Sequence, residues 1–182
     1  MTRIIQVWSL LTAVTVLSFS GLSAQSRIEG DLYLLSSSGE VKPGAANEVA
    51  LIPRGPAVVE AWRAMCEDQE AESERVNSAI EGRDPREGLA MLLAMVGLQR
   101  DEKFELLRSL STVRSGTGMA AHYEIEAPQG DYWLFATMPL GDVVHSWLHA
   151  VTLSGAAQRV DLDNGNVSTG GQLACDKPFP PN

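Results

Sequence analysis

The feature that most constrains the fold is a change of hydrophobic period, which happens twice along the chain. In residues 27–53, and again from residue 119 to about 162, short apolar or alternating runs are separated by turn residues, as in β-strands. Between about residues 55 and 112, apolar side chains instead recur every three or four positions, the period of an amphipathic helix. The chain is therefore predicted to be mainly β, with a helical segment between its early and its later strands.

Two helices are predicted within that segment. Gly82 ends the first helix, and Asp84 can cap a second one that has Pro85 in its first turn. Two helices joined by so short a break are predicted to form an antiparallel hairpin, whose apolar faces pack on each other and on one face of a sheet. The apolar faces of the two helices run through Val59, Trp62, Cys66, Gln69, Ser73, Val76 and Ile80, and through Leu89, Leu92, Leu93, Val96, Phe104, Leu107 and Leu110.

The remaining strand-like segments together have the length of an immunoglobulin-like β-sandwich, about 100 residues. Residues 132–138 are apolar on both faces, which is typical of a strand in the middle of such a fold. We predict a sandwich domain over residues 25–166 with a helical hairpin inserted at about 55–112, followed by an irregular tail over residues 167–182.

The N-terminus has the organisation of a secretory signal. Arg3 and the terminal amine precede an uncharged, mostly apolar stretch over residues 4–19, and small residues lead up to Ala24. We expect residues 1–24 to be removed and the remainder to be exported, to the periplasm or the cell exterior. An uncleaved anchor remains the alternative.

The charge of the chain excludes some classes of partner, and its two cysteines allow a disulfide. A formal net charge of −9, without a basic run, argues against nucleic acid or an anionic membrane surface, and no membrane span is predicted after residue 24. Cys66 and Cys175 both lie in the exported part, where a disulfide can persist. A Cys66–Cys175 bridge is predicted, with a buried Cys66 and a free Cys175 as the open alternative.

The strand-like segments also carry a family resemblance. Residues 30–35 (Gly-Asp-Leu-Tyr-Leu-Leu) and 39–43 (Gly-Glu-Val-Lys-Pro), together with the Pro-x-Gly turn and Tyr-x-Leu strand within residues 122–136, resemble carboxypeptidase regulatory-like domains. The resemblance covers roughly residues 28–54 and 117–166, and the helices fall outside it. It implies a transthyretin-like sandwich with an accessory, adhesive or binding role, and it supplies no catalytic residues.

One segment has the spacing of a metal site. His145 and His149 are four residues apart, as in zinc hydrolases, but the segment is predicted to be a strand. On a strand the two side chains share a face about 13 Å apart, too far for one metal ion without a bulge. No metal, cofactor or catalytic residue is therefore predicted. A metal-dependent hydrolase using both histidines with Asp142 or Asp163 is kept as an alternative.

Trp133 and Trp147 suggest a second alternative, a carbohydrate-binding module that stacks sugars on surface aromatics, although large aromatic rings more often fill a sandwich core. The favoured interpretation is an exported, non-enzymatic binding or interaction module of the bacterial envelope. Its partner is an unknown protein or glycan, and we expect the helical hairpin to make the contact.

Overall fold

The computed structural model describes residues 25–168, 173–176 and 179. The predicted secretory signal, residues 1–24, lies outside them. The strands are β1 (Gln25–Asp31), β2 (Tyr33–Leu35), β3 (Val41–Pro43), β4 (Glu48–Pro53), β5 (Val113–Gly116), β6 (His122–Pro128), β7 (Gly130–Leu140), β8 (Val143–Leu153) and β9 (Gln158–Arg159). The helices are α1 (Pro56–Ile80) and α2 (Pro85–Ser109).

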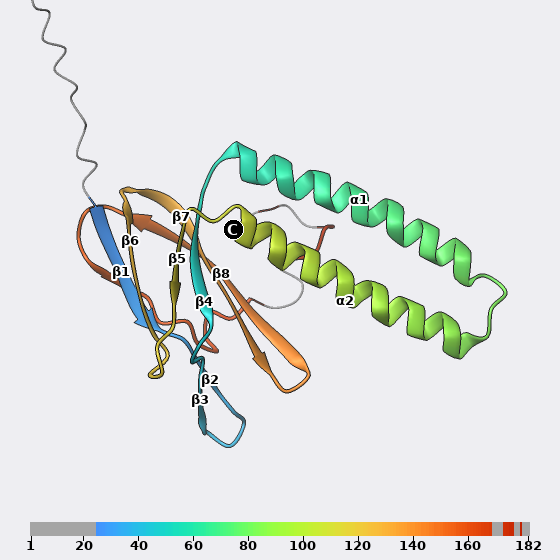
Figure 1. Cartoon of the computed structure of the whole chain (residues 1–182), viewed down its shortest axis with the longest axis horizontal. Helices are drawn as coiled ribbons and strands as arrows, with labels where there is room; N and C mark the ends of the chain where they lie inside the picture. The colour runs from blue at the N-terminus through green and yellow to red at the C-terminus, as the bar shows by residue number, and fades with distance from the viewer. Residues whose placement is uncertain (1–24, 169–172, 177–178, 180–182) are drawn as a thin grey trace, which may run out of the picture.

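Two sheets form a β-sandwich, so the predicted fold class is confirmed. One sheet has the strand order β6-β1-β9 and the other β5-β4-β7-β8, while β2 and β3 form a separate ribbon that projects from the body (Figure 1). Every pairing within the two sheets is antiparallel except β1 with β9.

The space between the sheets is filled by alternate side chains of both. On β6, Tyr123 and Ile125 are buried, and His122 and Glu124, which alternate with them, are exposed, as the alternation predicts. Gly30 on β1 lies so close to the Val160 carbonyl oxygen that any side chain there would collide with it. The core between the sheets consists of Ile28, Leu32, Leu34, Val49, Leu51, Tyr123, Ile125, Ala127, Tyr132, Leu134, Ala136, Met138, Trp147, Val151, Leu153 and Leu162.

A second core lies on the other face of the four-stranded sheet. There Trp133 and Phe135 of β7 meet side chains from both helices, so β7 is buried on both faces, as predicted. The second core consists of Ala50, Ile52, Val58, Trp62, Phe104, Leu107, Trp133, Phe135, Leu148, Leu173 and Phe179. The molecule therefore has three layers where the helices cover the sheet.

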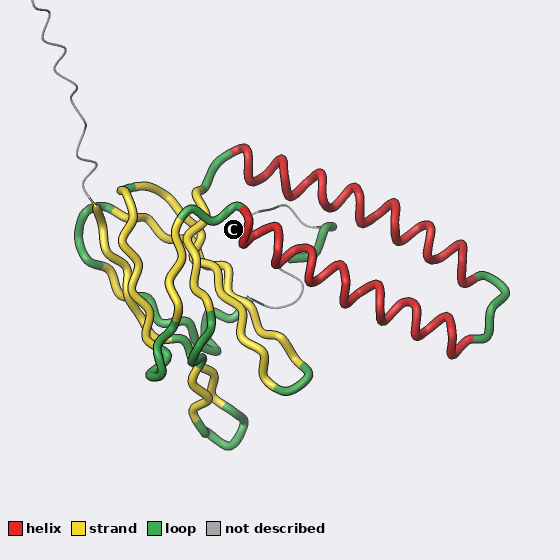
Figure 2. Tube along the Cα trace, viewed as in Figure 1, coloured by secondary structure: helices red, strands yellow, loops and turns green. Residues whose placement is uncertain are grey.

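The two helices are inserted between neighbouring strands. The chain leaves the sheet after Pro53 and returns at Val113, which pairs with Leu51, so the insertion begins and ends at adjacent points (Figure 2). Each helix has a proline in its first turn, and the Asp84 carboxylate caps α2 by accepting a hydrogen bond from the Arg86 amide at 2.9 Å. Neither helix of the described residues has the length and apolarity needed to cross a bilayer.

Candidate functional site

The part of the hairpin nearest the sandwich, which we call the root, is held firmly against the sheet. Leu107 of α2 is fully buried, and Phe104 packs on Phe135 of β7 with ring centroids 6.1 Å apart. On α1, Trp62 is 4 % exposed and belongs to the same core. The root consists of residues 56–69 of α1 and 99–109 of α2.

The C-terminal segment ties the root down further. Cys66 of α1 is bonded to Cys175, with Cα atoms 5.5 Å apart, so the predicted disulfide is confirmed. Phe179 stacks on Trp62, with centroids 4.4 Å apart, and its ring also lies 5.4 Å from that of Trp133. The segment predicted to be an irregular tail therefore places buried side chains in the second core. Its two large buried apolar residues, Leu173 and Phe179, were the available sequence signal.

A polar contact between the helices marks the outer limit of the root. The Gln69 side chain is 5 % exposed and donates to the Gln99 carbonyl oxygen and to Glu102, each at 3.0 Å. In return, the Gln99 side-chain amide donates to the Gln69 carbonyl oxygen at 3.2 Å and to the Ser73 hydroxyl at 2.9 Å. These reciprocal bonds fix the register of the helices at the point where they leave the sheet.

Beyond this contact lies the distal half of the hairpin, residues 70–80 and 85–98, which projects well past the sandwich (Figure 1). Residues 88–99 of α2, which reach from the distal half to the first residue of the root, form twelve consecutive positions without a charged side chain. Four of their large apolar side chains are nevertheless exposed: Leu89 (57 %), Leu93 (64 %), Val96 (59 %) and Leu98 (65 %). The prediction that the apolar faces of the helices pack on each other and on the sheet is wrong for Leu89, Leu93 and Val96, because more than half of each of these side chains is exposed.

The exposed side chains lie on two sides of α2. Leu89, Leu93 and Val96 share one face, whereas Leu98 lies on the opposite one. Leu98 borders a groove of about 490 Å³ between the helices, whose apolar lining also includes Val76, Met91 and Met95. Because a helix that is apolar on several sides is normally covered on several sides, this surface is the strongest candidate for a contact site.

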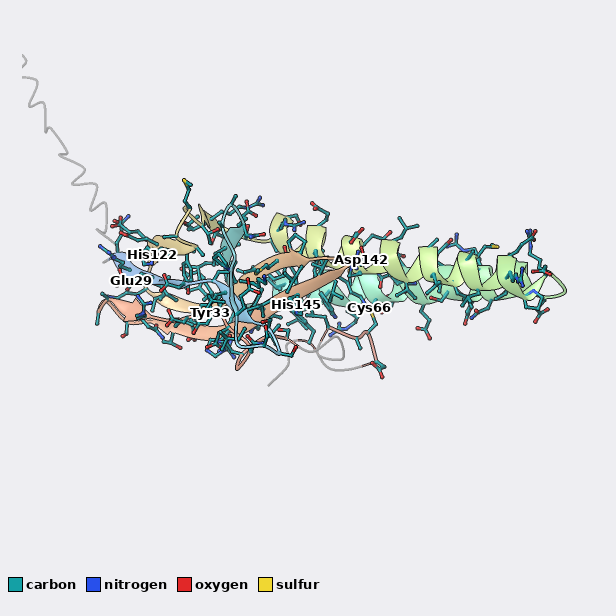
Figure 3. All side chains as sticks on the ribbon, turned by 90° about the horizontal axis from the view of Figure 1, so that it is seen from below. Glu29, Tyr33, Cys66, His122, Asp142 and His145 are labelled. Carbon is teal, nitrogen blue, oxygen red and sulfur yellow. A yellow bond between two sulfur atoms is a disulfide. The ribbon has the colours of Figure 1, made fainter. Side chains whose placement is uncertain are left out.

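A second cluster of functional side chains lies at the far end of the sandwich (Figure 3). Glu29, His122 and Glu124 are the described residues whose potential metal-ligating atoms all lie within 4.8 Å of one another. Arg27 already bonds both glutamates, at 2.6 and 3.0 Å, and His122 Nδ1 lies 2.9 Å from the Asp31 carboxylate. A cation here must compete with Arg27, so the arrangement acts as a cross-strand charge network on the exposed sheet face.

The same network affects one titratable group. The hydrogen bond with His122, and then that with Arg159, holds the pKa of the Asp31 carboxyl below its ordinary value against the opposing effect of burial. These side chains are exposed by about two-fifths, so solvent screens the interaction and its contribution to stability is small.

The histidines singled out in the sequence do not meet in the structure. His145 and His149 both lie on β8, opposite Met138 and Leu134 of β7. Asp142 lies in the turn before β8, and Asp163 accepts a hydrogen bond from Tyr33 at 3.3 Å. Within the described chain, neither histidine belongs to a group of three ligands close enough to share a metal ion.

Both tryptophans proposed as a sugar platform are buried. Trp147 is fully buried between the sheets and donates its indole N–H to the Asp163 carbonyl oxygen at 2.9 Å. Trp133 is 3 % exposed in the second core, with the Arg54 guanidinium 5.4 Å from its ring centroid. Neither ring offers a face on which a sugar can stack, so the surface-aromatic alternative does not hold for these residues.

Comparisons with known proteins define no family. No family model matches the chain, and no curated protein matches it. Among solved structures it is similar to a Pseudomonas aeruginosa protein to which carbohydrate binding is provisionally ascribed, at 17 % identity and a TM-score of 0.40 over 78 % of this chain and 90 % of the other. It is also similar to a minor pilin of Streptococcus agalactiae, at 14 % identity and a TM-score of 0.38 over 80 % of this chain and 46 % of the pilin.

A third likeness, to the pilus backbone protein of Streptococcus pneumoniae, has 8 % identity and a TM-score of 0.31, over 77 % of this chain and 41 % of that one. The chain thus spans less than half the length of either pilin. At these scores the likenesses carry no argument about function. What the structure establishes is a class of architecture: a β-sandwich with a helical hairpin inserted between two paired strands of one sheet.

Proposed function

We propose that the protein is an exported, non-enzymatic interaction module of the bacterial envelope, and that the distal half of the hairpin contacts its partner. The observation that carries the proposal is the twelve-residue uncharged stretch of α2, whose large apolar side chains are exposed on two sides. A surface of this kind normally marks a site of association.

The division of the hairpin supports the same role. The root is held by a disulfide and by packed aromatic rings, so the distal half projects from a rigid base. A rigid base fixes the direction in which the helices project before binding and so reduces the entropy lost on association. The acidic charge of the chain favours an apolar or complementary protein surface over nucleic acid.

The resemblance to carboxypeptidase regulatory-like domains belongs to this proposal. Such domains serve as accessory, adhesive or binding modules, and the two-sheet sandwich is compatible with that family. The secretory signal at residues 1–24 and the loss of that segment on export are likewise part of the proposal. An enzymatic role is not favoured, because the histidine and aspartate candidates lie apart.

Photocrosslinking in the native envelope tests the proposal. A photoreactive residue is introduced at Leu93, which is 64 % exposed on the distal half, and in a matched variant at Val41, which is 56 % exposed on the β2–β3 ribbon. We expect a specific crosslinked adduct from position 93 and none from position 41. Equal crosslinking at the two positions, or none at position 93, overturns the assignment of the contact surface.

A further inference from the structure

We propose that the groove between α1 and α2, which extends from the end of the root into the distal half, binds a cationic amphipathic helix of another protein. This inference rests on the proposed function, because it states the chemistry of the partner for one side of the same hairpin. It is carried by the apolar wall that α2 supplies to the groove and by the carboxylates that line the wall from α1.

The wall that α2 supplies is apolar. Met91, Met95 and Leu98 line it at the four- and three-residue spacing by which helices pack together. Leu98 is 65 % exposed and lies on the opposite side of α2 from Leu107, which is buried in the core against the sheet. The groove therefore opens away from the sandwich. Methionine side chains are flexible and adapt to the shape of an apolar surface that binds to them.

The wall that α1 supplies carries charges at the same spacing. Asp68, Glu72 and Arg75 line it, and Glu102 of α2 lies at the end of the groove that belongs to the root. Arg75 is already paired with Glu72, with nitrogen and oxygen 2.8 Å apart. The ion pairs of the described residues include neither Asp68 nor Glu102. The lining thus has three carboxylates against one guanidinium, and two of the carboxylates have no cationic partner in the described chain.

The surroundings of the groove have the same sign of charge. Between residues 67 and 80, α1 carries five carboxylates and one basic side chain. Between residues 85 and 105, α2 carries four carboxylates and three basic side chains. A partner with positive charge is therefore attracted on approach. A second copy of this chain, with a formal net charge of −9, is repelled, and so is an anionic membrane surface.

The hydrogen-bonding groups of the groove favour the same partner. The Gln69 and Gln99 side-chain amides each donate to the main-chain carbonyl of the other, and Gln69 also donates to Glu102 at 3.0 Å. With these donors engaged, and Arg75 held by Glu72, the groove offers mainly carboxylate oxygens, which only accept. Lysine and arginine side chains supply both the donors and the positive charge that these oxygens need.

The size and the spacing of the groove favour a helix as the form of the partner. Its volume of about 490 Å³ lies within the range of ligand-binding sites. Amphipathic helices bind in apolar grooves through side chains three and four positions apart. One border of the bound helix faces Met91, Met95 and Leu98, and the other faces Asp68 and Glu72. The partner helix therefore needs an apolar stripe with lysine or arginine along one border.

The test is fluorescence anisotropy with a labelled synthetic peptide, an amphipathic helix of leucine and lysine about 18 residues long. The same peptide with glutamate in place of each lysine is the control ligand. We expect the exported form of the protein, with its disulfide intact, to bind the lysine peptide and not the glutamate peptide. Leu98→Gln should weaken binding about tenfold, because it removes an apolar contact without adding charge. Leu93→Gln, an equally exposed change on another side of α2, should bind like the parent protein.

Charge reversal tests the acidic wall. Asp68→Lys should weaken binding of the lysine peptide about tenfold, because it places like charges opposite one another. Glu70→Lys makes the same change of charge about 160° away around α1 and should have a much smaller effect. Equal losses in the two variants would show general attraction to an acidic chain and would overturn the groove as the site. Circular dichroism of each variant checks that the helices are retained.

A lysine peptide that does not bind, or that binds equally to Leu98→Gln and Leu93→Gln, also overturns the groove as the site. Either result leaves the proposed function standing when position 93 still crosslinks to an envelope protein. Sedimentation velocity of the protein alone tests a second copy as the occupant. A dimer that dissociates in Leu98→Gln would assign the groove to this chain itself and would overturn the cationic partner.

Discussion

The root and the distal half of the hairpin are built from the same two helices, yet they differ in almost every contact. In the root, side chains such as Trp62 and Leu107 are at most a few per cent exposed. In the distal half, Leu93 lies on the same side of α2 as Leu107, and more than half of its side chain is in solvent. The helical period does not change between the root and the distal half. The difference in exposure therefore depends on whether the sheet and the C-terminal segment lie opposite the helix.

An apolar stripe on a helix can have two roles. Where the sheet and the C-terminal segment lie opposite, the stripe stabilises the fold. Where nothing in the described chain lies opposite, the same pattern becomes a surface available for association. The reciprocal hydrogen bonds between Gln69 and Gln99 lie at the boundary, so the two halves meet at a defined point of the helices.

The largest expected effect comes from removing the disulfide that secures the root. The double variant Cys66→Ser/Cys175→Ser opens a link between residues 109 apart in sequence. The free energy of unfolding should fall by about 4–5 kcal/mol in the chain-entropy model. Urea denaturation measures it, and a value equal to that of the parent protein would show that the C-terminal segment does not secure the root.

A matched pair of substitutions on one helix compares the two halves directly. Leu107→Ala removes a fully buried side chain from the root, and we expect a loss of about 2–5 kcal/mol in the free energy of unfolding. Leu93→Ala makes the same chemical change in the distal half and should alter it by no more than about 0.5 kcal/mol in dilute solution. Equal losses would contradict the division.

A smaller effect of opposite sign is expected at Lys103, which lies next to the boundary. Burial lowers the pKa of its ammonium group, with Asp176 acting weakly in the other direction. Lys103→Met removes this cost, so the variant should melt at a slightly higher temperature than the parent protein at neutral pH.

The gain in stability from Lys103→Met should depend on pH. The cost of the buried charge is fully present below the folded-state pKa and disappears as the pH rises to the ordinary value of about 10.4. The gain from Lys103→Met should therefore shrink in alkaline solution. A variant less stable than the parent at neutral pH would show that the ammonium group contributes favourable contacts.

The sequence predicts much of the fold because its periods are local. Alternation on β6 correctly separates buried Tyr123 from exposed His122, and Gly82 and Asp84 mark the turn between the helices. The sandwich and its helical insertion follow from these signals. The disulfide follows from the only two cysteines of the chain, Cys66 and Cys175, both in the part expected to be exported.

The sequence does not predict which part of the apolar face of α2 is buried against another segment. Leu89 and Leu107 are equivalent by the helical period, yet Leu89 is exposed and Leu107 is buried, because the sheet lies beneath only the second of them. Phe179 is missed for the same reason. An apolar residue in a proline-rich tail suggests burial but does not show that its ring stacks on Trp62. Both outcomes depend on contacts between segments far apart along the chain.

The candidate site could not be predicted for the same reason, because it depends on contacts between distant segments. The sequence predicts Leu89, Leu93 and Val96 as part of the apolar face of the second helix, and it does not show that this part of the face is exposed. Trp133 and Trp147 could not be placed in a core or on a surface until the two sheets and the helices were assembled. The cluster around Glu29 and His122 likewise depends on the β1–β6 register.

Hydrogen–deuterium exchange along the two helices, in dilute solution, tests the central claim most directly. The amides of residues 104–109 should exchange only through global unfolding, whereas those of residues 88–98 should exchange faster through local opening, because few buried contacts hold them. Uniform protection along α2, equal to that of the sheet, would contradict the division of the hairpin into a root that stabilises the fold and a distal half that is free to bind.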